Sequence, residues 1–204
     1  MASVFFAWSM RAIPKATSLN CKSGVSVFVS RGTVIAYWLI PVEPSRSFFQ
    51  RMINDLARRY DAPSFDPHVT VHVGSDHADA AESALAEAAR VCKSINLKAL
   101  EIGHSSEFIK TLFEQFALNT ELRQLNEIIR DAAQDSSRYE LNPHLSLLYK
   151  KIPDAVRCEL AGSIKVPFSE VVFDLLKAVR CVSPTQSATD VEAWRLVATK
   201  QLSG

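Results

Sequence analysis

Two histidines, His68 and His144, are each followed two residues later by a hydroxyl side chain, Thr70 and Ser146. On a strand, residues i and i+2 project side by side, about 7 Å apart at their bases, so each motif pairs an imidazole with a hydroxyl. An imidazole with an ordinary pKa of about 6.5 can accept or donate a proton near neutral pH. Two such motifs around one cavity could supply the base and the acid for attack of water on a cyclic phosphodiester, while the hydroxyls bind phosphate oxygens.

The histidine-x-hydroxyl pattern alone is a weak signal, because the chain has five histidines and a third copy occurs at residues 104–106. The longer context of the other two copies is more specific. Residues 66–71 read Asp-Pro-His-Val-Thr-Val and residues 142–147 read Asn-Pro-His-Leu-Ser-Leu, which agree in type over six positions. We therefore interpret His68 and His144 as the catalytic pair and the copy at His104 as a chance occurrence in a turn.

The elements that must position these motifs can be predicted from hydrophobic periodicity and breakers. In both motifs a proline ends an irregular loop and the histidine opens a strand. We predict strands at 34–41, 68–74, 95–102, 108–118, 145–149, 166–181 and 191–202, and helices at 45–60, 76–92, 119–134 and 153–161. Adjacent strands are too frequent for a purely parallel sheet, so the fold class is α+β with mixed or antiparallel sheets.

These residues resemble the two-histidine (2H) phosphoesterase superfamily, and within it the cyclic phosphodiesterase group. The similarity extends over residues 34–202. It includes an opening strand, the two motifs, a closing strand and a tryptophan: Tyr37–Pro41, Phe65–Thr70, His144–Tyr149, Phe173–Val182 and Trp194.

The resemblance implies a bilobal fold, in which two pseudo-symmetric lobes with antiparallel sheets surround a central cleft. It implies hydrolysis of nucleoside 2′,3′-cyclic phosphates, or of ADP-ribose 1″,2″-cyclic phosphate, to a monophosphate. It also implies that Tyr149 binds the substrate together with Thr70 and Ser146. An odd offset of five from His144 places Tyr149 on the opposite face of a regular strand, so this role requires the strand to end or bulge at Leu148.

Composition favours a small anionic substrate. The chain has 204 residues, of which 48% are hydrophobic, and its 23 basic and 22 acidic residues provide no basic excess for binding a long nucleic acid. We expect a monomer that does not associate with membranes, because no apolar run approaches the roughly 18 residues of a membrane span. The four cysteines form no C-x-x-C pair, which favours reduced thiols in a cytoplasmic setting.

The first 33 residues differ from the rest, since they contain four basic and no acidic residues. We expect a disordered or leader extension at 1–33, followed by a cyclic phosphodiesterase-like domain at 34–204. Transit peptides are also basic and poor in acids, so an organellar location is the alternative to the cytoplasm.

Several other residues and functions also need an interpretation. His72 shares the strand face of His68, but i and i+4 lie roughly 13 Å apart on a strand, which is too far for both to bind one metal ion. We expect no metal site here and no other cofactor. We expect His72 at the cleft rim or as a hydrogen-bonded structural residue, and His77 exposed at a helix start.

The other functional candidates are an RNA-end enzyme related to the 2′-5′ RNA ligases, acting on short RNA ends, and an inactive nucleotide-binding module. Phe65 and Phe113 could stack on a base, although core packing is favoured for Phe113.

Overall fold

The computed structural model describes residues 31–137 and 139–203, so the predicted extension at 1–33 lies outside the described residues except for its last three positions. The described strands are β1 Gly32–Pro41, β2 Val69–Ser75, β3 Ile95–His104, β4 Leu112–Phe116, β5 His144–Leu148, β6 Glu170–Ser183 and β7 Arg195–Gln201. The helices are α1 Ser45–Tyr60, α2 Ala78–Val91, α3 Thr120–Ala132, α4 Asp154–Ser163 and α5 Ala188–Glu192, with a 3₁₀ turn, η1, at Phe108–Lys110.

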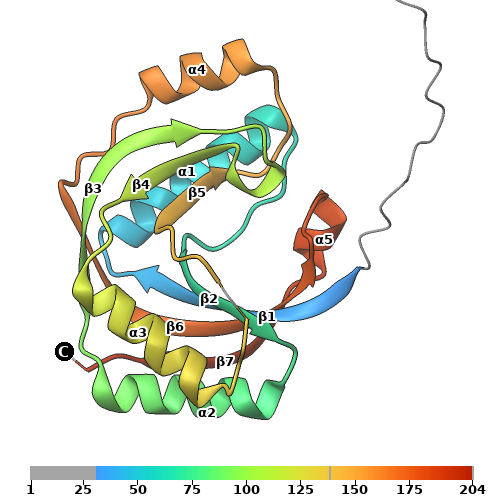
Figure 1. Ribbon diagram of the computed structural model, residues 1–204. Coiled ribbons are helices and arrows are strands. Elements are labelled where there is room, and N and C mark those ends of the chain that lie inside the picture. Colours follow the sequence, from blue (N-terminus) through green and yellow to red (C-terminus); the bar gives the residue numbers. More distant parts are fainter. Residues whose placement is uncertain (1–30, 138, 204) are drawn as a thin grey trace, which may run out of the picture. The chain divides into compact units, whose positions relative to one another are not determined.

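The described strands form one seven-stranded sheet in the order β1-β2-β5-β4-β3-β6-β7, and β1 also pairs with β6. All of the strand pairs are antiparallel. One half of the sheet, β1, β2, β6 and β7, lies beside α2 and α3, while β3, β4 and β5 lie beside α1 and α4 (Figure 1). These two halves are the lobes of the fold. The antiparallel sheet and the helices beside it confirm the predicted α+β class.

The main helices form where sequence periodicity places an apolar stripe and a cap. In α1, Phe49, Ile53 and Leu56 recur at helical spacing and are buried, while Arg58 and Arg59 occupy the last turn. Helix α3 is capped by the Asn119 side chain, which accepts a hydrogen bond of 2.9 Å from the backbone N–H of Leu122. None of the helices in the described part of the chain has the length and apolarity needed to cross a membrane.

Two short elements differ from the sequence prediction. The strand predicted from residue 108 begins only at Leu112. The single hydroxyl proton of Thr111 has the carbonyl oxygens of Glu107, Phe108 and Lys150 within hydrogen-bond distance, and this local bonding holds the chain in the turn η1. The strand predicted from residue 191 begins only at Arg195. Before it the chain forms α5, which is capped by the Ser187 hydroxyl.

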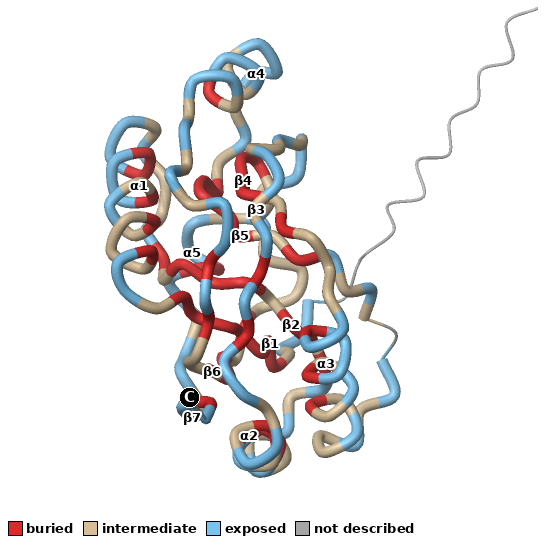
Figure 2. Tube along the Cα trace, turned by 90° about the vertical axis from the view of Figure 1, so that its left-hand side faces the viewer, coloured by how far each residue is buried: buried red, intermediate tan, exposed pale blue. Residues whose placement is uncertain are grey.

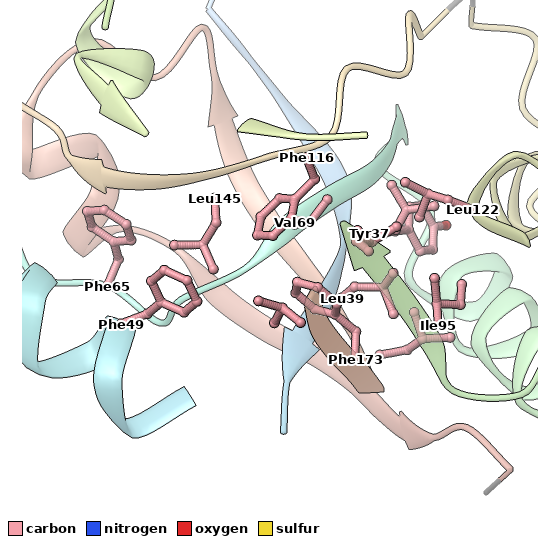
Figure 3. Packing of buried hydrophobic residues seen from close by; sticks show 14 of the residues in the cluster. Tyr37, Leu39, Phe49, Phe65, Val69, Ile95, Phe116, Leu122, Leu145 and Phe173 are labelled. Atoms are coloured by element: carbon pink, nitrogen blue, oxygen red, sulfur yellow. The ribbon is translucent and has the colours of Figure 1, made fainter. Parts of the chain in front are cut away.

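The main core lies between the sheet and the helices, and the buried residues follow the strands through both lobes (Figure 2). Figure 3 shows part of this cluster, in which Leu39 and Phe173 from one lobe lie near Val69 and Leu145. Val69 and Leu145 are fully buried. This cluster therefore extends across the junction between β2 and β5, which is where the two histidine motifs are found.

Candidate active site

The pairing of β2 with β5 determines how the two motifs meet. Val69 on β2 lies directly opposite Leu145 on β5 in an antiparallel register. Both side chains point into the main core (Figure 3). Successive strand residues point to opposite faces, so the residues on either side of this central pair point away from the core.

An antiparallel register also sets which of these residues are neighbours. In antiparallel strands the residue before Val69 lies opposite the residue after Leu145, so His68 lies across from Ser146. By the same register Thr70 lies across from His144. The two motifs are therefore related by a local two-fold axis through the central pair, and both imidazoles and both hydroxyls belong to one face of the sheet.

Each imidazole is oriented by a backbone carbonyl within its own motif. Nδ1 of His68 lies 2.6 Å from the carbonyl oxygen of Asp66, and Nδ1 of His144 lies 2.7 Å from that of Asn142. A carbonyl can only accept a hydrogen bond, so each Nδ1 carries a proton. The reactive atom of each ring is therefore Nε2, and the Asx-Pro-His sequence builds the same orientation twice.

His68 is the more enclosed of the two rings. It stacks on Trp38 with ring centroids 3.8 Å apart and planes 15° apart. The ring of Trp194 meets it at a steep angle, with centroids 6.3 Å apart. Burial lowers the pKa of His68 to about 4, although the hydrogen bond to Asp66 acts in the opposite direction. His68 is therefore neutral at physiological pH, as a general base must be.

His144 is partly exposed and lies at the start of β5. Its ring meets Phe113 at a steep angle, with centroids 5.5 Å apart. Burial lowers its pKa, the hydrogen bond to Asn142 opposes this change, and the charge of Lys110 adds to it. The two histidines therefore share an orientation but differ in enclosure.

A cavity of about 270 Å³ opens beside the first motif. His68 and Thr70 line it, together with Trp38, Trp194 and Tyr149. His144 and Ser146 are not among its lining residues. The Ser146 hydroxyl donates a hydrogen bond of 2.7 Å to the carbonyl of Ile109, and Ile109 itself lines the cavity. The η1 turn therefore lies between the second motif and this cavity.

Tyr149 lies on the same side as the motifs, although strand alternation from His144 would place it on the opposite face. Strand β5 ends at Leu148, so the alternation does not apply to the next residue. The ring of Tyr149 stacks on Phe65 with centroids 3.8 Å apart. Burial raises its pKa, so the phenol keeps its proton and can donate a hydrogen bond.

Several residues of the site were not assigned to it from the sequence. Trp38 lines the cavity with Val34 and Ala36, because alternate residues of β1 share a face. The run of apolar residues in this strand conceals that alternation. Trp194 follows α5 and reaches the site only through the tertiary fold.

Gln115 on β4 holds the loop that precedes His144. Its side-chain amide donates to the side-chain oxygen of Asn142 at 3.0 Å and to the carbonyl of Pro143 at 2.8 Å. On the first motif, Asp66 forms an ion pair with Lys177 from β6. Each Asx-Pro segment is therefore anchored by a side chain from another strand, which helps to fix the position of the histidine that follows it.

The remaining histidines lie outside this arrangement. His72 is almost completely buried, and its Nε2 lies 2.8 Å from a carboxylate oxygen of Asp135. This favours the hydrogen-bonded structural interpretation over a metal site shared with His68. His77 is exposed, as predicted. His104 ends β3 and lies beside Cys158 of α4.

The chain is similar to known proteins over almost all of the described residues. Residues 33–202 match the family described as "Cyclic phosphodiesterase-like protein". A curated "Cyclic phosphodiesterase" of Arabidopsis thaliana is 25% identical over 174 residues, which cover 83% of this chain and 96% of the relative.

Solved structures share the fold at low sequence identity. E. coli LigT complexed with 3′-AMP is 12% identical and has a TM-score of 0.54, with 83% of this chain and 98% of that chain covered. TT0787 of Thermus thermophilus is 15% identical and has a TM-score of 0.53, with 84% and 98% covered. At these identities the likeness supports the fold alone.

Proposed function

Since the chain belongs to the cyclic phosphodiesterase-like family of the two-histidine phosphoesterases, and is thus a phosphodiesterase, we propose that its substrate is a small cyclic phosphodiester. The substrate classes are a nucleoside 2′,3′-cyclic phosphate and ADP-ribose 1″,2″-cyclic phosphate, and the product is a phosphomonoester. The observation that carries this proposal is the antiparallel register of Val69 with Leu145, which gathers both histidine-hydroxyl motifs on one face.

The proposed reaction is an acid/base hydrolysis without a metal ion. Nε2 of His68 accepts a proton from water as the water oxygen attacks phosphorus. The bond between phosphorus and one ribose oxygen breaks, and Nε2 of His144 donates a proton to that oxygen. His68 is assigned as the base because its pKa of about 4 keeps it neutral, and the more accessible His144 is assigned as the acid. Each proton transfer contributes on the order of 10²- to 10⁴-fold to the rate.

In the proposed reaction the hydroxyl groups bind the phosphate. Thr70 and Ser146 can donate hydrogen bonds to the non-bridging oxygens, on which negative charge builds in the transition state. Ser146 must turn its proton away from the carbonyl of Ile109 to do so. The protonated phenol of Tyr149 is a further donor on the same cavity wall.

The lining of the cavity favours a nucleoside-bearing substrate. The rings of Trp38 and Trp194 both face it, with centroids 5.2 Å apart. Aromatic faces stack on any nucleobase, so this wall can bind a base without reading its identity. A second cavity of about 220 Å³ adjoins it and shares both tryptophans, which offers room for the longer ADP-ribose compound.

Turnover of 2′,3′-cyclic nucleotides and of ADP-ribose 1″,2″-cyclic phosphate by the full chain in excess EDTA tests this function. We expect both assays to yield a phosphomonoester, with the product resolved as a 2′- or 3′-phosphate to show which bond breaks. Activity that disappears with EDTA and returns with a metal would refute the metal-independent reaction. Turnover confined to RNA oligomers with cyclic phosphate ends would favour the RNA-end enzyme instead, and an absence of turnover would favour a binding module.

The two proton-transfer roles can be separated with an aryl phosphodiester such as a nitrophenyl ester. A nitrophenolate leaves without protonation, so the general acid is not needed for this substrate. We expect His144→Ala to lose far less activity on the aryl ester than on the cyclic nucleotide, whereas His68→Ala loses activity on both. The reverse pattern would exchange the two roles.

A further inference from the structure

Among the described residues, three side chains with metal-binding atoms converge outside the candidate active site. They are His104 at the end of β3 and Asp154 and Cys158 on α4. Nε2 of His104 lies 3.5 Å from Sγ of Cys158, and Sγ lies 4.0 Å from Oδ2 of Asp154. We propose that these residues form a zinc site that attaches α4 to the β3–β4 hairpin.

The spacing of the donor atoms agrees with tetrahedral coordination. Zinc binds sulfur at about 2.3 Å and imidazole nitrogen at about 2.0 Å, so tetrahedral angles place these two atoms about 3.5 Å apart. The distance between Sγ of Cys158 and Nε2 of His104 is also 3.5 Å. All three donor atoms lie within 4.8 Å of one another, so one ion can contact all of them after small side-chain adjustments. A water molecule completes the fourth position.

The types of donor favour zinc over other common divalent ions. A thiolate and an imidazole suit Zn²⁺, whereas Mg²⁺ and Ca²⁺ prefer oxygen ligands alone. Asp154 and Cys158 are one helical turn apart, so they project from the same face of α4. Arg157 pairs with Oδ1 of Asp154 at 2.6 Å, which leaves Oδ2 on the side of the thiol. Binding replaces the thiol proton of Cys158, which is released to solvent.

The packing of α4 gives such an ion a structural role. Leu160 is the one residue of this helix that is buried. The helix lies at the outer edge of its lobe, against β3 and β4 (Figure 1). A zinc ion bound by both His104 and α4 would hold the helix in place where it makes few apolar contacts.

The same connection lies next to the candidate active site. The turn that follows His104 includes Ile109, which accepts the hydrogen bond from Ser146 and lines the catalytic cavity. The Ser105 hydroxyl closes this turn by donating to the carbonyl of Lys110. Zinc at His104 would therefore fix the beginning of the segment that covers the second motif.

Cobalt binding to the full chain, stripped with EDTA and then freed of chelator, tests the site. Cobalt(II) replaces zinc in such sites, and its bond to a thiolate gives a strong near-ultraviolet charge-transfer band. We expect the band to saturate at one cobalt per chain and to be displaced by zinc. The Cys158→Ser variant should lose the band, and His104→Ala should weaken binding at least tenfold. Cys92→Ser, which changes a half-buried thiol away from the cluster, is the matched control and should keep it.

The outcomes separate this proposal from the catalytic one. A missing band, or a band that survives Cys158→Ser, would overturn the zinc site, whatever the hydrolase activity. Zinc is also expected to slow amide hydrogen exchange in α4 of the wild type at least tenfold, but not in Cys158→Ser. Unchanged exchange in the wild type would refute the structural role. Turnover in EDTA is expected to persist in either case, since none of the three ligands belongs to the catalytic motifs.

Discussion

The two imidazoles of the site have the same tautomer and different surroundings. A carbonyl two residues earlier in the chain holds a proton on each Nδ1, so both rings present Nε2. His68 is stacked against Trp38, whereas His144 is more open to solvent. This difference is the physical basis for assigning one ring as base and the other as acid.

The pH dependence of the free enzyme follows from these surroundings. Both histidines have pKa values below 6.5. Below the lower of the pair's two pKa values both rings are protonated and the base is lost, and above the higher both are neutral and the acid is lost. We expect kcat/KM for a 2′,3′-cyclic nucleotide to follow a bell-shaped curve with its maximum below pH 6.5. A maximum above pH 7 would be inconsistent with this pair of residues.

The motif residues could be predicted because each half-site is local in sequence. Asp66 and His68 lie within one short segment, so a six-position match identifies them before any tertiary structure is known. Trp194 and Ile109 join the site only through pairing of distant strands, and neither belongs to a repeated pattern. Their positions therefore could not be predicted from the sequence.

At the scale of the elements, Gly103 on β3 makes room for the ring that touches His144. A Cβ atom at this position would lie 2.5 Å from the ring of Phe113, which is too close for any real contact. Phe113 packs against the imidazole of His144. The sheet thus depends on a small residue here to set the position of the side chain proposed as the general acid.

We expect Gly103→Ala to displace Phe113 and with it His144. Displacements near 1 Å can cost about 100-fold in rate, so kcat should fall by roughly 10- to 100-fold while the protein stays folded. Measurement of kcat together with circular dichroism tests this. Gly162→Ala is the matched control, because nothing lies within 4 Å of a Cβ atom there, and it should leave kcat unchanged. Equal rates for the two variants would contradict the positioning role.

The buried pair of His72 and Asp135 connects β2 to the segment after α3. Their side chains are 1% and 4% exposed, and Asn126 of α3 lies next to the same imidazole. Removal of one partner leaves an uncompensated buried group, so His72→Ala should lower the free energy of unfolding by about 3 kcal/mol. Urea unfolding measures this. His77→Ala, at an exposed position, should change it by less than about 0.5 kcal/mol, and similar values for both variants would exclude the structural role.

Element order could be predicted well where apolar periodicity was long. Helix α1 has the expected bounds, because both its apolar stripe and its end at Tyr60 can be recognised in the sequence. The missed elements η1 and α5 are only a few residues long, and side-chain caps at Thr111 and Ser187 define them. Such local hydrogen bonds compete with strand propensity and leave little periodic signal.

At the scale of the whole molecule, the site exists because two lobes share a sheet. Strand β2 of one lobe and β5 of the other pair at Val69 and Leu145. On the far side of the sheet β3 pairs with β6, so the lobes are joined at two places. The α+β class followed from the order of elements, but this register could not be predicted, because it depends on pairing between segments far apart in the chain.

The proposed reaction requires one proton-transfer residue from each lobe, and alanine substitution of the two histidines tests this directly. Hydrolysis of a 2′,3′-cyclic nucleotide in excess EDTA is compared for wild type, His68→Ala, His144→Ala and the control His77→Ala. We expect kcat to fall on the order of 10²- to 10⁴-fold in each of the first two variants and to remain unchanged in the control. Near wild-type turnover by either His68→Ala or His144→Ala, in a folded protein, would contradict catalysis by this pair.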